Sequence, residues 1–228
     1  MFPAFLDFQI LIDSQYLPLF IKGLKTTLLL CVLGNFISII IGILIGLAKL
    51  SPIKPLKYFA SAYVEVFRNT PLLVQVYFFF FGLGLEPFWA GLSGLCTYTS
   101  AYMAEVIRAG IQSVPEIEIK AGEALGLNTY DRISKVILPQ AFRIIIPPMS
   151  NQLMNLTKNT SIVYFITVAD VTYIFETLSA QTFKFFEFFI VAALTYMIIC
   201  WIIALISYFA ERYYYVPGMN NLEVGLDH

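Results

Sequence analysis

Long apolar stretches alternate with short polar connections along most of this chain. A helix needs about 20 apolar residues to cross the core of a bilayer, and five stretches are expected to do so. They cover approximately residues 24–47, 58–83, 92–106, 144–168 and 185–209. The third is the weakest, because serine, threonine and glutamate interrupt it. It is counted as a span because a third crossing places most of the basic residues before and after it on the same side of the membrane. The pattern predicts an all-α integral membrane protein with about five transmembrane helices, in one domain.

The composition agrees with this fold class. Of the 228 residues, 59% are hydrophobic and 13% are charged, which lies outside the usual range for a soluble domain. The formal net charge of -1 and the scattered basic residues argue against nucleic acid as a partner. Cys31, Cys96 and Cys200 stand singly in apolar segments, without the spacing of a metal site. We expect them to be small packing residues.

The basic residues orient the predicted helices. If the chain crosses the membrane five times, the basic residues within 49–57 and 108–143 lie on one side of the membrane, whereas Lys22, Lys25 and Lys184 lie on the other. The positive-inside rule then places the N-terminus outside and the C-terminus in the cytoplasm. We predict an extracytoplasmic segment over residues 1–18, a transmembrane domain over residues 19–215 and a cytoplasmic tail over residues 216–228.

Small and paired residues are expected to fix how the helices pack. Gly42 and Gly46 form a G-x-x-x-G face, which lets helix backbones approach closely. We favour its use inside the protomer over a contact with a second subunit. Charged residues three positions apart can pair on one helical face, and we expect two such pairs, Glu65 with Arg68 and Glu105 with Arg108.

The polar connection between the third and fourth spans is predicted to form two short helices. Residues 113–116, with the sequence SVPE, have the form of a capping box with proline in the first turn. Gly126 would end the first helix, and Asn128 would cap the second. Ala121 and Gly122 on the surface of the first helix would let it enter a groove of a partner. The alternative is a helical hairpin that lies passively on the membrane.

This connection resembles the cytoplasmic signature of the permease subunits of ATP-binding cassette (ABC) importers. The signature reads E-A-A, three residues, G, nine residues and I-x-L-P. Lys120, Ala121 and Gly122 fall on the triplet, Gly126 on the glycine and Leu138-Pro139 on the final pair. Lys120 and Gly122 depart from the pattern, so a salt bridge of the glutamate would be missing here.

Three longer stretches are similar to the polar amino acid branch of these permeases, and the similarity extends over most of residues 19–218. They are YVEVFRNTPLLVQVYFFFFGLG from Tyr63, AYMAEVIRAGIQSVP from Ala101 and ILPQAFRIIIPPMSNQLMNLTKNTS from Ile137. The resemblance implies a subunit that forms half of a pathway for an amino acid and binds no cofactor itself. In agreement, the sequence has no G-x-x-x-x-G-K-[ST] phosphate loop.

The resemblance also implies partners and a location. They are a cytoplasmic ATPase dimer that binds ATP and Mg, an extracytoplasmic solute-binding protein, a second permease subunit, identical or homologous, and the lipid of a bacterial cytoplasmic (inner) membrane. Residues 114–126 would be the coupling helix that the ATPase holds. The contacts expected there are Glu116, Lys120, Ala121, Gly122, Glu123, Ala124, Leu125 and Gly126.

Polar residues at membrane depth mark the expected pathway, because an ionisable group there is costly and usually faces a pathway or a partner. The proline pair at residues 147–148 is expected to break or bend the fourth span. Lys158 would bind a substrate carboxylate or pair with a glutamate such as Glu65 or Glu105, whereas the hydroxyls of Thr160 and Ser161 would line the pathway or bond their own helix. The predicted pathway residues are Gln152, Asn155, Lys158, Asn159, Thr160, Ser161, Arg68, Asn69 and Thr70.

The substrate is predicted with less detail. The run Lys158-Asn159-Thr160-Ser161 resembles permeases described for glutamate and aspartate, and a lysine without an adjacent carboxylate suits an acidic amino acid. A glutamine or basic amino acid permease of the same family is the alternative. A stand-alone secondary carrier is disfavoured, because no internal repeat is visible in the sequence.

Overall fold

A computed structural model describes residues 15–214, and every regular element in that range is helical. The α-helices are α1 (Leu17–Leu50), α2 (Lys54–Asn69), α3 (Leu72–Tyr77), α4 (Pro87–Gln112), α5 (Glu116–Ala124), α6 (Thr129–Asp131), α7 (Leu138–Asn159), α8 (Val171–Thr182) and α9 (Phe185–Tyr214). Phe78–Gly82 and Arg132–Ile137 are π-helical, and Thr160–Ile166 is a 3-10 helix. The all-α prediction is confirmed. Residues 1–14 and 215–228, where most of the predicted end segments fall, lie outside the described residues.

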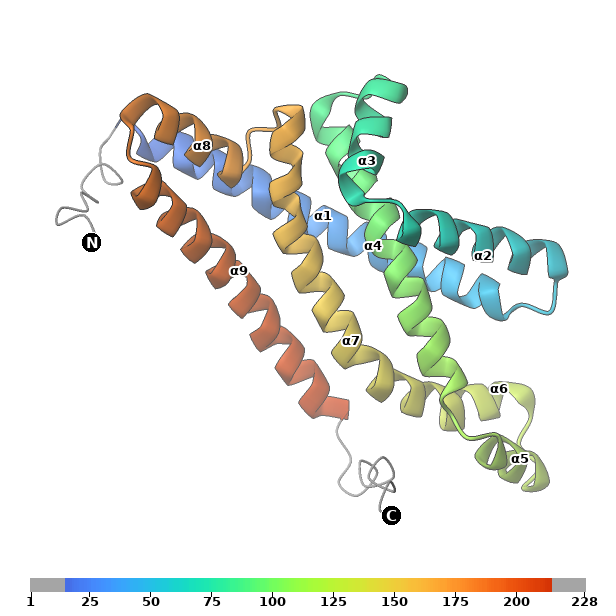
Figure 1. Ribbon diagram of the computed structural model, residues 1–228. Coiled ribbons are helices and arrows are strands. Elements are labelled where there is room, and N and C mark those ends of the chain that lie inside the picture. Colours follow the sequence, from blue (N-terminus) through green and yellow to red (C-terminus); the bar gives the residue numbers. More distant parts are fainter. Residues whose placement is uncertain (1–14, 215–228) are drawn as a thin grey trace, which may run out of the picture.

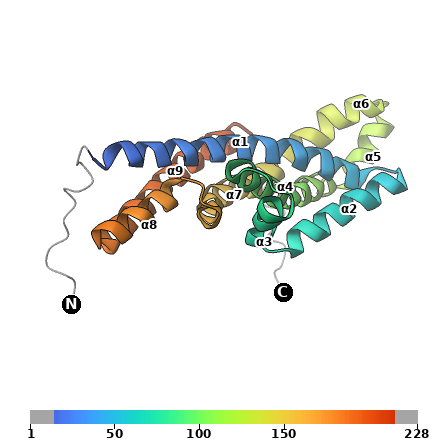
Figure 2. The ribbon, with the colours of Figure 1, turned by 90° about the horizontal axis from the view of Figure 1, so that it is seen from above.

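One long helix supports the others. Figure 1 shows α1 running behind α4 and α7, with α8 beside its N-terminal half and α2 beside its C-terminal half. Seen from above, α2 and α8 lie on the same side of α1 (Figure 2). The short helices α5 and α6 lie together at the end of the molecule opposite the start of α1.

Helix α1 packs on α4 through glycines. A Cβ atom added at Gly42 would lie 2.7 Å from Cβ of Met103, and one at Gly46 would lie 2.9 Å from the carbonyl oxygen of Ala104. Neither position has room for a side chain unless the helices separate. The G-x-x-x-G face therefore packs inside the protomer, as favoured from the sequence.

Helix α4 is longer and more central than the weak stretch predicted at residues 92–106. Its Gly91 packs on Val163, and its Gly94 lies so close to Val76 that an added Cβ would be 2.6 Å from that side chain. Because neighbouring helices surround α4, its polar residues meet protein instead of lipid. A hydropathy pattern therefore underestimates the length of a helix whose polar residues contact protein.

The second predicted span, residues 58–83, is two helices. Pro71 lacks an N–H and disfavours helical backbone in the residue before it, so α2 ends at Asn69 and Thr70 is extended, with φ -107° and ψ 131°. The side-chain amide of Gln75 donates to the carbonyl oxygens of Phe67 and Thr70 at 2.8 and 3.0 Å. These bonds satisfy backbone groups that the break exposes.

The fourth predicted span breaks later than expected. The proline pair 147–148 lies inside α7 without ending it, whereas the chain turns by 52° between the helical run 129–166 and α8. Asp170 caps α8 by accepting a hydrogen bond from the Tyr173 N–H at 2.8 Å. The hydroxyl of Tyr196 on α9 donates to the other carboxylate oxygen of Asp170 at 2.9 Å. The buried aspartate thus joins α8 to α9.

Two of the described helices, α1 and α9, are each long and apolar enough to cross a membrane. The bent pair 129–166 and 171–182 would make a third span by the same test. The count of five spans stays a prediction, since the other expected spans include the broken α2–α3 segment and the protein-enclosed α4.

Candidate functional site

A polar cavity of about 230 Å³ lies between α4 and α7. Its lining residues are Tyr98, Thr99, Tyr102, Gln152, Asn155 and Asn159. All six side chains are uncharged, and each carries a hydroxyl or an amide group that can donate and accept hydrogen bonds. We call it the amide cavity. It can hold a polar group of a small solute without supplying a fixed charge.

The amide cavity follows from helical spacing. On α7, positions 152, 155 and 159 are separated by three and four residues and so lie on one face. On α4, Tyr98 and Tyr102 are four apart, with ring centroids 4.9 Å from each other. The two tyrosines were not among the predicted pathway residues. Their i, i+4 spacing was the available signal.

A second cavity of about 430 Å³ lies between the end of α1, α2 and α4. Its lining residues are Lys49, Val64, Glu65, Arg68, Asn69, Tyr102 and Glu105. We call it the charged cavity. Tyr102 lines both cavities, so they meet at this side chain. The Arg68 guanidinium lies 5.0 Å from the centroid of the Tyr102 ring, and the tyrosine hydroxyl donates to the Arg68 carbonyl oxygen at 3.4 Å.

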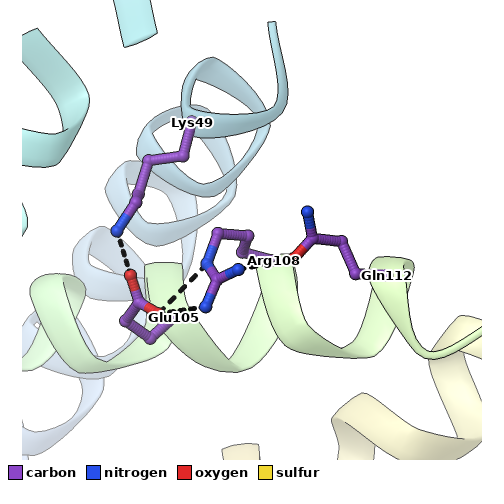
Figure 3. Close-up of polar contacts among 4 residues, drawn as sticks. All are labelled: Lys49, Glu105, Arg108 and Gln112. Atoms are coloured by element: carbon purple, nitrogen blue, oxygen red, sulfur yellow. Dashed lines mark hydrogen bonds and ion pairs between the residues drawn. The ribbon is translucent and has the colours of Figure 1, made fainter. Parts of the chain in front are cut away.

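Beside the charged cavity, an ion-pair network joins α1 to α4 (Figure 3). Arg108 pairs with Glu105 at 2.8 Å, as the spacing predicted, and also contacts Gln112. Lys49 pairs with the same glutamate from α1, a partner that the sequence did not indicate. The side chains of Lys49 and Glu105 are only 16% and 18% exposed, so the network is partly shielded from solvent.

The predicted pair between Glu65 and Arg68 is not formed. Within residues 15–214 no ion pair joins them, and both residues are exposed. The guanidinium of Arg68 lies over the ring of Tyr102, an attraction that competes with an exposed ion pair of small value.

Five of the nine predicted pathway residues line a cavity, three the amide cavity and two the charged cavity. The hydroxyls of three others donate hydrogen bonds to backbone carbonyl oxygens one turn earlier in the chain. Thr70 donates to Val66, Thr160 to Thr157 and Ser161 to Lys158, at 2.7, 2.8 and 2.8 Å. For Thr160 and Ser161 this is the alternative left open by the sequence.

Lys158 is exposed and is not among the lining residues of either cavity. One residue is about 100° around a helix, so Lys158 leaves α7 in a different direction from Asn159, although it is three residues from Asn155. Neither Glu65 nor Glu105 pairs with it among the described residues, and Glu105 is held by two other cations. Lys158 therefore lies outside the lining of both cavities, and its role in binding a substrate carboxylate stays a prediction.

The segment α5 forms without the expected capping box. The Ser113 hydroxyl donates to the Gly110 carbonyl oxygen at 2.7 Å, so this serine belongs to the last turn of α4, and Pro115 precedes the first residue of α5. Gly126, with φ +80°, ends α5 as predicted. Asn128 also acts as predicted, because its side chain accepts from the Asp131 N–H at 2.9 Å.

One face of α5 is free and the other is packed. Ile117 is 73% exposed and Leu125 is 82% exposed. Gly122 was expected on the surface, but it is buried: an added Cβ would lie 3.4 Å from Leu127 and 3.6 Å from Arg132. Position 122 therefore faces the segment that follows α5, at distances that leave room for a Cβ atom. The other seven predicted coupling residues are exposed.

Salt bridges and a hydrogen bond complete the packing of α5. Glu123 pairs with Arg132 at 3.0 Å, and Glu118 accepts a hydrogen bond from the Gln140 amide. Lys120, the departure from the signature, pairs with Glu116 one turn earlier at 3.0 Å. Both side chains of this last pair are exposed, so it contributes little.

Comparison with known proteins identifies the fold family. The family described as binding-protein-dependent transport system inner membrane component matches residues 38–214. The chain belongs to this family. Members are permease subunits of ABC transporters, which form the pathway and leave ATP hydrolysis to a partner. In general such a permease works with an ATPase, a binding protein and a second permease.

Curated relatives place the permease in the polar amino acid branch. It is 37% identical to the Probable glutamine ABC transporter permease protein GlnM of Bacillus subtilis (strain 168), over 85% of this chain and 91% of the relative. It is 34% identical to the L-cystine transport system permease protein TcyB, covering 89% of each chain. It is 35% identical to the arginine transport system permease protein ArtQ, over 91% of this chain and 96% of the relative. Both are from the same organism.

Solved structures agree. A crystal structure of an amino acid ABC transporter with histidines matches with a TM-score of 0.82 and 37% identity, over 92% of this permease and 99% of that chain. An inward facing MetNI methionine ABC transporter matches with a TM-score of 0.74 and 17% identity, over 90% of this permease and 100% of that chain. At this identity the match supports the fold and nothing more.

Proposed function

We propose that this permease forms the pathway for a polar amino acid through the cytoplasmic (inner) membrane of a bacterium, in a pair with an identical or homologous permease. The observation that carries the proposal is the amide cavity, in which two helices far apart in the sequence present six hydrogen-bonding side chains. A cytoplasmic ATPase dimer supplies the energy, and an extracytoplasmic binding protein delivers the solute. This orientation follows the basic residues of the sequence.

Helix α5 is the proposed coupling helix. Its packed face is fixed to the rest of the chain, and Ile117 and Leu125 are exposed on the other. Exposed apolar side chains on a helix suit insertion into a groove, here of the ATPase. ATP can move the permease through α5 only if the helix is held differently in the two ATPase states.

Glutamine is the substrate that the amide cavity favours. The sequence favoured glutamate or aspartate because of Lys158, but this lysine lines neither cavity, and an uncharged cavity would have to desolvate a second carboxylate without a cation. A side-chain amide instead finds donors and acceptors in Gln152, Asn155 and Asn159. An acidic substrate remains the second candidate, and it depends on Lys158.

ATP-driven uptake into proteoliposomes tests both candidates. The permease would be reconstituted with its cognate ATPase and binding protein, and uptake of labelled glutamine, glutamate and arginine compared. We expect glutamine to be taken up fastest, and Asn155→Leu to lower its uptake about tenfold through the loss of hydrogen bonds of about 1 kcal/mol or more. Asn151→Leu, the same change at an exposed position of α7, is the matched control.

The opposite pattern would identify the second candidate. If glutamate were taken up fastest, with Lys158→Ala abolishing its uptake and Asn155→Leu without effect, the amide cavity would not be the substrate site. Uptake of none of the three amino acids with ATP would contradict the proposed function as a whole.

A further inference from the structure

The charged cavity holds two cations and two carboxylates and so has no net formal charge. The cations are Lys49 and Arg68, and the carboxylates are Glu65 and Glu105. Such a lining does not favour a net-charged ligand, because an anion would face both glutamates and a cation would face both basic groups. It favours a ligand that carries both signs at separate positions.

Half of these charges are engaged and half are available. Lys49 and Glu105 pair with each other, and Arg108 also binds Glu105 (Figure 3). In the part of the chain that the structure describes, the Glu65 carboxylate has no ion pair or hydrogen bond, and the Arg68 guanidinium contacts the Tyr102 ring. The available pair is thus one carboxylate and one guanidinium.

The spacing of this pair fits the head group of an amino acid. Residues three apart on a helix have Cβ atoms about 5–6 Å from each other, and both long side chains can converge on one small ligand. An α-amino acid carries its ammonium and its carboxylate on the same carbon. Because Tyr102 holds the guanidinium from one side, less conformational freedom is lost when Arg68 binds a carboxylate.

We infer that the charged cavity is a second amino acid site, in which Glu65 binds the ammonium group and Arg68 the carboxylate of the zwitterionic head group. The Asn69 amide remains for the rest of the ligand. This inference rests on the proposed function, since the two cavities meet at Tyr102 and the second site would follow the amide cavity on the way to the cytoplasm. Amino acid that accumulates in the cytoplasm would then occupy it and slow further import.

Inhibition from the inside tests this site. Proteoliposomes with the complete transporter would be loaded with glutamine, with 4-aminobutanamide, which lacks the carboxylate, or with glutaramic acid, which lacks the ammonium. The initial rate of ATP-driven uptake would be measured against an unloaded sample of the same variant. We expect internal glutamine to inhibit the wild type, and either analogue to need an at least about tenfold higher concentration, because each loses a charge-assisted contact.

Variants assign the inhibition to this cavity. Glu65→Gln and Arg68→Gln should each raise the half-inhibitory concentration of internal glutamine at least about tenfold. Lys57→Gln, an exposed charge on the same helix outside the cavity lining, should leave it unchanged. Equal inhibition of wild type and both variants, equal potency of the analogues, or no inhibition of the wild type would each overturn the inference.

Direct binding separates this site from the proposed function. Labelled glutamine binding to the detergent-solubilised permease–ATPase complex should saturate at two molecules per permease chain, of which Glu65→Gln removes one and Asn155→Leu the other. If transport fails but Glu65→Gln still removes one bound molecule, the site stands and the proposed function falls. A zwitterionic lipid head group would give the alternative result: the effects of Glu65→Gln would disappear in liposomes without phosphatidylethanolamine, and the inference would be wrong.

Discussion

Replacing Leu125 with serine should weaken the hold of the ATPase on the permease without affecting the fold. The side chain is 82% exposed at the C-cap of α5, directly after Ala124, and complete burial of a leucine is worth about 1.5–3 kcal/mol. If docking covers the exposed part, the leucine contributes about 1.2–2.5 kcal/mol to binding. Its loss should raise the dissociation constant roughly 8- to 70-fold.

The measurement is ATP-driven uptake in permease proteoliposomes titrated with purified ATPase. The ATPase concentration at half-maximal uptake should rise by that factor for Leu125→Ser, with the thermal stability of the permease unchanged, since surface substitutions usually stay within about 0.5 kcal/mol. Tyr130→Ser is the control, because Tyr130 is 78% exposed on the neighbouring α6 outside the proposed contact. A half-maximal concentration within twofold of wild type for Leu125→Ser, or an equal rise for the control, would refute docking through this face of α5.

Two further predictions concern local stability. Gly122→Ala should stabilise α5 by up to about 1 kcal/mol, because alanine is favoured over glycine inside a helix and its Cβ would find ordinary contacts at 3.4 Å or more. Gly126→Ala should destabilise the end of α5 by about 1 kcal/mol, because φ is +80° at this position. Hydrogen exchange of residues 116–127 would show slower exchange for the first and faster for the second, and the reverse order would contradict this account. Asp170→Ala should loosen α8 by about 1–2 kcal/mol through the lost cap, seen as faster exchange in residues 171–175 while residues 116–124 are unchanged. Unaltered protection of α8 would mean that the cap is dispensable.

Backbone chemistry in the connection could be predicted from the sequence, because it depends on residues close to one another in the chain. The end of α5 at Gly126 and the cap at Asn128 are both of this kind. The capping box failed for a related reason. The Ser113 hydroxyl can bond to the end of α4 or cap the start of α5, and in the structure it donates to the Gly110 carbonyl oxygen at the end of α4.

The facing of residues inside the bundle could not be predicted as well. Hydropathy counts residue types along the chain, whereas lipid and protein neighbours are set by tertiary packing. Tyr102 was therefore left out of the predicted pathway although it lines two cavities, and the role of Lys158, which lines neither of them, stays a prediction. The partner of Glu105 on α1 is 56 residues away in the chain, and no local pattern indicates it.

A single helix connects the proposed coupling segment to the proposed substrate site. Gln140, near the start of α7, is bonded to Glu118 of α5, and Asn159, at the end of the same helix, lines the amide cavity. The 19 steps between them correspond to about 28 Å of helix at 1.5 Å per residue. Arg132, just before α7, adds a second attachment through Glu123. If the ATPase moves α5, α7 must move with it or these contacts must break, so the α7 wall of the amide cavity would shift against α4, which is fixed to α1 by the glycine contacts and by Lys49.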